Sequence, residues 1–240
     1  MHERLTRFST DSELSRFNRS AGRWTSVSPA LEALLRASLA AYELSGGLVH
    51  VGVLPALLAA GYTRDFAAGP TEPSGAPVIV PPLPDIVALR PGEAKLSEGA
   101  AIDLGGLAKG WLADRAVERL GSNALANLAG DLRAIGGGPD GEGWPVGFGG
   151  TTVLLRDMGA ATSGTTARRW GDGLHHLIDP RTGLPAATDL REVSVIARTG
   201  TEAEVLAKTA LLLGTAEGER FLAARALGSH LVPADAPDPG

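Results

Sequence analysis

The chain has 240 residues, of which 44% are hydrophobic, so it is long enough to bury a substantial core. Its 27 acidic and 22 basic residues give a formal net charge of −5 and form no basic stripe, which argues against nucleic acid as a partner. The sequence has no cysteine, no apolar run of signal-peptide length at its start and none that would span a membrane, so we expect a cytoplasmic protein without disulfides or thiolate sites.

The first half of the chain is predicted to contain two helices and one irregular segment. Ser28 followed by Pro29 is a helix-start signal, and residues 46–47, both glycine, end the helix that follows. Residues 53–60 are apolar enough for a short second helix. Residues 67–84 are rich in proline, glycine and alanine, which predicts a surface excursion or linker and not a core element.

The second half mixes short strands with helices. We expect strands at residues 86–90, 124–128, 131–135, 144–148, 152–156, 191–197 and 228–232. Helices are predicted at residues 106–120, 201–213 and 215–226, and residues 233–240 form a flexible tail. Short strands joined by glycine turns, with helices inserted among them, favour an α+β fold over a regular parallel sheet.

The stretch from Ala101 to Gly110 is the most informative one for chemistry. Asp103 ends an apolar strand, Gly105 and Gly106 follow, and Lys109 stands in the first turns of a helix. Paired glycines let a ligand approach the backbone N–H groups of a helix start, where the dipole favours anions, and a lysine adds a point charge. An ordinary strand–turn–helix with a surface lysine explains the same residues equally well.

Three further clusters have a functional and a purely structural interpretation. Asp131 follows an apolar strand and Gly130, and it belongs either to a binding loop or to a simple turn. Ser163 lies in a small-residue turn, residues 161–164, whose hydroxyl and N–H groups suit a phosphate. If residues 174–178 form a strand, one of the adjacent histidines His175 and His176 faces inward, and a histidine near a phosphate can act as a general base or as a charge partner.

Taken together and in order, these clusters resemble the ApbE family of FAD:protein FMN transferases from about residue 5 to 232. The motifs that carry the resemblance are DSELSRFNRSAG, DLGGLAKGWLAD, NLAGDLRAIG, ATSG, HHLIDPRTGLPA and AEVLAKTALLLG. The resemblance implies a single domain over residues 1–240 with a T-fold-like architecture of mixed, largely antiparallel sheets and packed helices. It also implies FAD as substrate, Mg²⁺ as a bound ion, and transfer of FMN to a Ser or Thr of an acceptor protein, with AMP leaving.

The same resemblance assigns roles to particular residues. It implies that His176 is catalytic, that FAD contacts Asp103, Lys109, Asp131, Ser163 and Ile178, and that the metal ligands come from Gly106, Glu204 and Thr209. We expect Asp103, Lys109 and His176 to converge on one pocket for the diphosphate. Two kinds of partner are considered: the acceptor protein, and a second copy of this chain in a homodimer.

This chain departs from the family pattern on the late helix. Glu204 stands where the family has an Asp metal ligand, and Lys208 stands where it has a Thr, with Thr209 one residue further on. An ammonium cannot ligate Mg²⁺, but it can take the place of a cation beside a diphosphate. The alternative is an exposed helix pair at spacing i,i+4 that contributes about 0.2–0.5 kcal/mol.

A second departure concerns the early part of the chain. Residues 47–52 lack the aspartate that the family has in the corresponding segment, and the chain begins at the first helical motif, without a leading strand that carries Met-Gly-Thr. We expect either a start further upstream or weaker flavin binding. A non-catalytic flavin-binding protein of the same fold is therefore the alternative function, and a scaffold without usable flavin affinity is the third.

Overall fold

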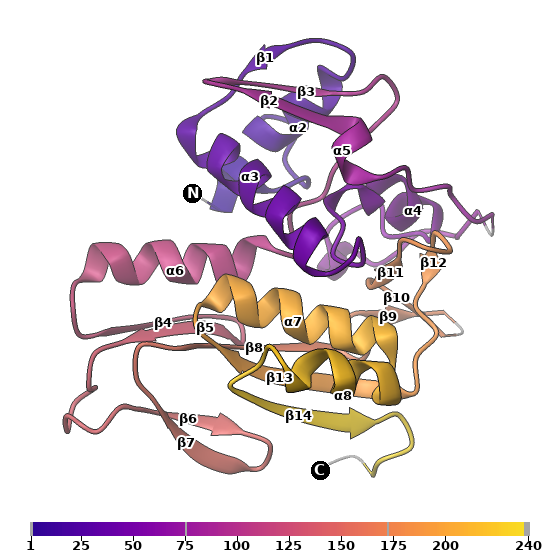
Figure 1. Cartoon of the computed structure of the whole chain (residues 1–240). Coiled ribbons are helices and arrows are strands. Elements are labelled where there is room, and N and C mark those ends of the chain that lie inside the picture. The colour runs from indigo at the N-terminus through magenta and orange to yellow at the C-terminus, as the bar shows by residue number, and fades with distance from the viewer. Residues whose placement is uncertain (1, 75, 172, 238–240) are drawn as a thin grey trace. The chain divides into compact units, whose positions relative to one another are not determined.

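The computed structural model describes residues 2–74, 76–171 and 173–237. The chain forms two compact units; it passes from the first to the second, returns to the first and ends in the second (Figure 1). Unit 1 comprises Met1–Gly106 and Arg168–Ala186, and unit 2 comprises Leu107–Ala167 and Ala187–Gly240. No helix within the described residues has both the length and the apolar character that crossing a membrane requires.

Unit 1 contains most of the helices. They are α1 (His2–Leu5), α2 (Glu13–Arg19), α3 (Pro29–Leu44), α4 (Leu54–Ala59) and α5 (Leu83–Ile86), with single 3₁₀ turns at Val51–Val53 and Phe66–Ala68. α3 begins as predicted, because the Ser28 hydroxyl accepts a hydrogen bond from the backbone N–H of Leu31. It ends before Gly46 and Gly47, whose positive φ angles of +61° and +90° glycine adopts without strain. The predicted helix at 53–60 is confirmed by α4.

The strands of unit 1 are short. β1 (Thr25–Ser26), β3 (Glu93–Leu96) and β2 (Val87–Arg90) form an antiparallel sheet in that order, and two ribbons follow: β9 (Arg169–Trp170) with β10 (Leu174–His175), and β11 (Ile178–Asp179) with β12 (Leu184–Pro185). The strand expected at 86–90 is confirmed by β2, which pairs with the unpredicted β3 through a tight turn. In the apolar core beside the ribbons, Trp170 and Ile178 pack with Tyr62.

The proline-rich segment of unit 1, residues 69–82, has neither helix nor strand at its described positions. Its backbone is nevertheless held at several points. The N–H of Thr71 donates to the carbonyl of Gly61 at 2.9 Å. The Val78 carbonyl lies so close to Gly183, whose φ is +66°, that a Cβ at Gly183 would stand 1.8 Å from the Val78 oxygen. Glycine is therefore required at position 183.

His50 holds the C-terminal end of this segment. Its Nδ1 accepts a hydrogen bond from the N–H of Gly52 at 2.9 Å, so its Nε2–H donates to the carbonyl of Pro81, also at 2.9 Å. Burial lowers the pKa of the imidazole, and the Pro81 contact raises it by less. His50 therefore serves as a neutral cross-link between two stretches of unit 1.

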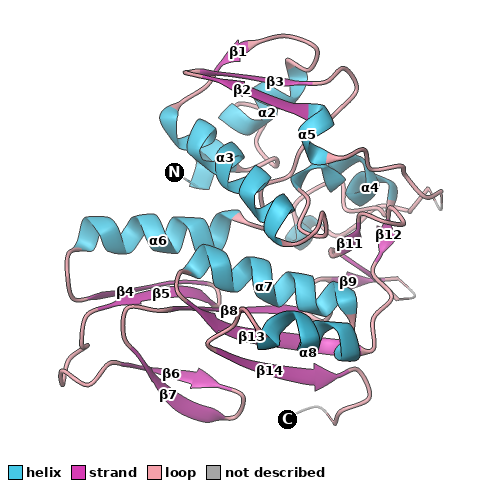
Figure 2. Ribbon diagram, viewed as in Figure 1, coloured by secondary structure: helices cyan, strands magenta, loops and turns pink. Residues whose placement is uncertain are grey.

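Unit 2 is built on a five-stranded antiparallel sheet. Its order is β14 (Gly228–Pro233), β13 (Leu190–Ala197), β8 (Gly159–Gly164), β5 (Asp131–Ile135) and β4 (Ala124–Leu128). α6 (Ala108–Leu120) and α7 (Gly200–Leu213) cover one face, as Figure 2 shows, and α8 (Thr215–Ala223) packs on α7 and β14. The hairpin of β6 (Trp144–Phe148) and β7 (Thr151–Leu155) packs its apolar side chains on the sheet. Helices packed on antiparallel sheets confirm the predicted α+β class.

Three glycines bring α6, α7 and β8 into backbone contact. A Cβ at Gly110 would lie 2.4 Å from the carbonyl oxygen of Gly200, and one at Gly159 would lie 2.3 Å from the Gly200 nitrogen. The start of α7 can therefore lie directly against α6, where no larger residue would fit. This close approach is what allows a side chain of α7 to reach the backbone of α6.

Three predictions need correction. Residues 161–164 are not a turn but the end of strand β8, in which Ser163 pairs with Val193. The residues of this strand are small because α7 packs closely on it. Small residues are also typical of turns, which is why the sequence predicted a turn here. The helix expected from residue 106 begins at Ala108. At the other end, β14 includes Pro233, and residues 238–240 of the expected tail lie outside the described residues.

Candidate functional site

Four charged side chains meet in unit 2, and we call them the charge cluster: Lys109, Asp131, Glu204 and Lys208. The Lys109 ammonium donates to Oδ2 of Asp131. Glu204 uses both of its oxygens, since Oε1 lies 3.6 Å from Nζ of Lys208 and Oε2 accepts the backbone N–H of Gly110 at 2.9 Å. Two ammonium groups therefore balance two carboxylates.

Each member of the charge cluster is placed by a regular element. Lys109 lies in the first turn of α6, and Glu204 and Lys208 lie one turn apart on α7. Asp131 opens β5 directly after a tight turn in which Ala129 and Gly130 have φ angles of +53° and +95°. The two-residue loop between β4 and β5 thus fixes the position of the Asp131 carboxylate.

The charge cluster is buried to different depths. Asp131 and Glu204 are 1% and 2% exposed, and the side chain of Lys208 is 13% exposed. The side chain of Lys109 is 35% exposed, so it is the member that a ligand can reach most easily. The alternative of an exposed Glu204–Lys208 helix pair is therefore wrong: α7 turns this face toward the interior of unit 2.

Burial governs the proton equilibria in the charge cluster. It raises the pKa of Asp131 to about 6, with the charge of Glu204 acting in the same direction and the two lysines opposing it. Burial and the charge of Lys109 lower the pKa of Lys208, whereas Glu204 and Asp131 raise it. The protonation of Asp131 and of Lys208 thus depends on the other charges of the cluster.

Glu204 and Thr209, the two expected Mg²⁺ ligands that lie in unit 2, do not form a suitable set of donors there. Mg²⁺ prefers about six oxygen ligands, but both Glu204 oxygens already have cationic or N–H partners. The Thr209 hydroxyl donates to the carbonyl of Val205 at 2.7 Å. It also stands about 140° around α7 from Glu204, since each residue advances about 100°. Within the described residues, no group of three or more acidic or histidine side chains could hold a metal ion.

In unit 1, Asp103 joins the glycine turn to a stacked arginine. Its Oδ1 accepts the N–H of Gly105 at 2.7 Å, and its Oδ2 accepts Nε of Arg7 at 2.6 Å. The Arg7 guanidinium lies over the rings of Phe8 and Tyr62, 4.2 and 4.5 Å from their centroids. Sequence reasoning missed Arg7, because nothing in the local sequence pairs it with an aspartate 96 positions away.

The two adjacent histidines of unit 1 have different environments. His175 is buried, its Nδ1 accepts the N–H of Leu177 at 3.3 Å, and its Nε2–H donates to the carbonyl of Ala186 at 3.0 Å. Burial lowers its pKa. His176 is partly exposed, and its backbone N–H donates to the carbonyl of Arg168 at 3.3 Å. The prediction that one of the pair faces inward is confirmed by His175, and a catalytic role of His176 stays a prediction.

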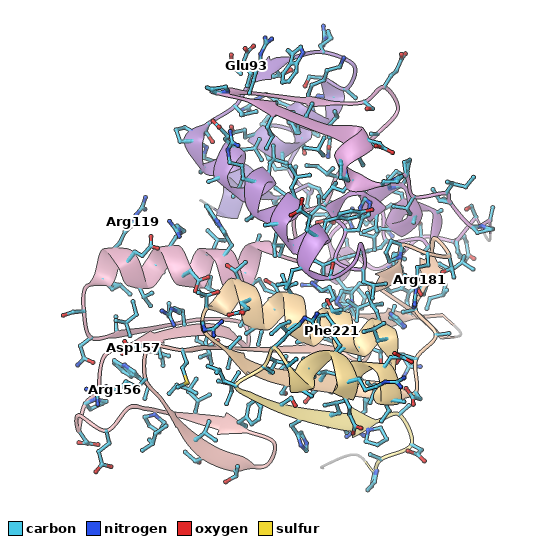
Figure 3. The ribbon with its side chains drawn as sticks, in the orientation of Figure 1. Glu93, Arg119, Arg156, Asp157, Arg181 and Phe221 are labelled. Carbon is cyan, nitrogen blue, oxygen red and sulfur yellow. The ribbon has the colours of Figure 1, made fainter. Side chains whose placement is uncertain are left out.

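The segment after the histidines is a turn held by an ion pair. Asp179 accepts from the backbone N–H and from the guanidinium of Arg181, with Nη2 at 2.7 Å from Oδ2, and this contact raises the pKa of Arg181. Figure 3 labels Arg181 at this turn. The side chain of Ile178 lies in the apolar core of unit 1, so a contact of this residue with FAD would fall to its backbone.

The structure thus brings together some of the predicted site residues. Lys109, Asp131 and Glu204 are joined in unit 2, and Ser163 lies in β8, the strand next to that of Asp131. Asp103, Gly106, His176 and Ile178 belong to unit 1. The convergence of Asp103 and His176 with Lys109 stays a prediction. Lys208 is the member of the charge cluster whose burial sequence reasoning did not foresee.

Comparison with known proteins gives a consistent assignment. The ApbE family pattern matches residues 1–230. The FAD:protein FMN transferase of Treponema pallidum is 37% identical over 140 residues, which are 48% of this chain and 39% of that relative. The chain thus matches less than half the length of this relative. The transferase of the same name from Haemophilus influenzae is 25% identical over 89% of this chain and 69% of its own length.

Solved structures agree at the level of the fold. The ApbE protein of Thermotoga maritima superimposes with a TM-score of 0.83 at 24% identity, covering 98% of this chain and 83% of that one. The flavin transferase ApbE of Vibrio cholerae gives a TM-score of 0.76 at 21% identity over 96% of this chain and 84% of its own. With a family match that includes every candidate residue of both units, this chain belongs to the ApbE family.

Proposed function

We propose that the protein transfers FMN from FAD to the hydroxyl of a Ser or Thr in an acceptor protein and releases AMP. The observation that carries this proposal is the family match over residues 1–230, together with relatives that are named FAD:protein FMN transferases. The match includes His176 and the charge cluster, so the residues to which this proposal assigns roles lie within it.

The proposed reaction is the displacement of AMP at the flavin-side phosphorus of FAD. The acceptor oxygen forms a new bond to this phosphorus, while the bond from the phosphorus to the bridging oxygen breaks and AMP leaves with that oxygen. The hydroxyl proton passes to the imidazole of His176, which acts as the general base. Lys109, the most exposed member of the charge cluster, supplies positive charge to the diphosphate.

A transfer assay tests this proposal. The purified protein is incubated with FAD and with an acceptor domain that an established flavin transferase modifies, in parallel with Mg²⁺ and with EDTA. We expect the acceptor to gain the mass of one FMN group, measured by intact-protein mass spectrometry, and AMP to appear in equal amount. If FAD binds but the acceptor gains no mass under either condition, the transfer function is wrong.

A second candidate function is stoichiometric flavin binding without transfer. The buried Lys208 favours it, because the resemblance to the family implies a metal ligand at this position. This candidate expects FAD affinity that EDTA does not change and no release of AMP in the same assay. Detection of AMP in proportion to acceptor would rule it out.

A further inference from the structure

We propose that Lys208 is a built-in counter-cation that takes the place of a divalent ion in unit 2, so that this protein binds FAD without Mg²⁺. The part of this inference that concerns FAD rests on the proposed function. The part that concerns metal binding rests on the charge cluster alone, and it can be tested without flavin.

The charge balance of the cluster is the first argument. Asp131 and Glu204 are almost completely buried, and buried carboxylates require compensation by positive charge. Lys109 supplies this positive charge to Asp131, and Lys208, 3.6 Å from Glu204, supplies it to Glu204. The cluster is therefore neutral as it stands. A divalent ion placed beside Glu204 would add two positive charges next to two ammonium groups.

The identity of the basic residues is the second argument. The chain has three lysines, Lys95, Lys109 and Lys208, and all its other basic residues apart from histidine are arginines. Two of the three lysines thus belong to this one cluster. A lysine ammonium is a compact point charge, whereas a guanidinium is a planar group with a fixed fork of donors, so lysine is the side chain that best substitutes for a small ion.

The position of the available oxygens is the third argument. Glu204 Oε2 accepts the N–H of Gly110, so this oxygen already has a partner at the start of α6. The Thr209 hydroxyl is bonded within α7. With Lys208 present, no oxygen of these two side chains lacks a partner within the helix pair.

The test compares the wild-type protein with Lys208→Thr, and with Lys208→Thr combined with Glu204→Asp. Mn²⁺ serves as the probe, and its binding is followed by electron paramagnetic resonance in the absence of FAD. We expect no saturable Mn²⁺ binding by the wild type. Both variants should bind one equivalent, because removal of the ammonium leaves a buried carboxylate without its counter-charge. The matched control is Lys95→Thr on β3, which should behave as the wild type does.

FAD affinity provides the second readout, measured by flavin fluorescence with EDTA and with Mg²⁺. The wild-type dissociation constant should agree within about twofold between the two conditions, whereas that of Lys208→Thr should be about tenfold weaker in EDTA and recover with Mg²⁺. If a variant is less stable than the wild type, Mn²⁺ should raise its melting temperature, because a ligand that binds only the native state stabilises it.

Several results would overturn the inference. They are stoichiometric Mn²⁺ binding by the wild type, loss of its FAD affinity in EDTA, or variants that neither bind Mn²⁺ nor are stabilised by it. Failure of the wild type to bind FAD under any condition would instead contradict the proposed function, and the Mn²⁺ measurement would still decide the role of Lys208.

Discussion

At the scale of single residues, adjacent side chains in this protein have separate tasks. His175 uses both ring nitrogens within unit 1, so it is a structural residue that could not exchange protons with a substrate without losing these contacts. His176 lies beside it and is partly exposed. His175 therefore has a structural role, and the proposed function assigns the proton transfer to His176.

Substitution of His176 tests this division. His176→Ala should reduce the rate of FMN transfer by about 10²–10⁴-fold, which is the usual contribution of a general base. FAD affinity should change little, because a base acts in the transition state and not in substrate binding. Rates from the mass assay and dissociation constants from flavin fluorescence give the comparison. Equal losses in both would assign His176 to binding, and His230→Ala on the exposed part of β14 is the control.

The sequence predicts the chemical types of the site residues better than their partners. The spacing of Glu204 and Lys208 indicates a helix pair, but only the packing of α7 shows that the pair is buried. Likewise, Asp103 is recognisable before its glycine pair, although the strand expected to end at this residue does not form, whereas its ion pair with Arg7 is formed by tertiary structure. Local patterns carry no information about contacts between distant segments, and those contacts set the electrostatics here.

At the scale of elements, periodicity and turn residues predict most of unit 2. The strands expected at 124–128, 131–135 and 144–148 have the observed bounds, because each is a short apolar run between glycine turns. Strand β8 was missed. Its glycine, alanine and serine residues have low β propensity, and they are present because α7 packs closely on this strand.

The contact between α6 and α7 can be tested by adding one methyl group. Gly110→Ala should lower the free energy of unfolding by about 1–3 kcal/mol, because its Cβ would overlap the Gly200 carbonyl and force the helices apart. Urea denaturation followed by circular dichroism measures the change. Gly147→Ala in β6, where a Cβ meets open space, should change stability by less than about 0.5 kcal/mol. Equal stabilities of the two variants would contradict the close packing.

At the scale of the whole molecule, the chain builds two units that differ in their titratable groups. Unit 1 contains the buried His50 and His175, whose pKa values are lowered by burial, and unit 2 contains Asp131, whose pKa is raised to about 6. The family match includes both units. That the 240 residues act as a single domain stays a prediction.

Acidification should therefore weaken unit 1. A buried histidine with a lowered pKa favours folding while it is neutral, so its contribution is complete above the unfolded value of about 6.5 and is lost as the pH falls below it. Asp131 has the opposite effect on stability in unit 2. Its pKa is raised in the folded state, so the folded state binds a proton at a higher pH than the unfolded state does and gains stability as the pH falls. Hydrogen exchange resolved by peptide, corrected for intrinsic rates, should show protection falling around His50 and His175 between about pH 7.5 and pH 5.5. Unchanged protection there would contradict this assignment.

The carbonyl contacts along residues 69–82 have a consequence for engineering. This segment lacks helix and strand, yet Thr71 and Pro81 hydrogen-bond it to two different parts of unit 1, and Val78 packs directly against Gly183. Replacing it with a short flexible loop would release all of these attachments at once. Residues 69–82 thus connect separate parts of unit 1. A deletion of this segment would lower the stability of the unit that contains His176.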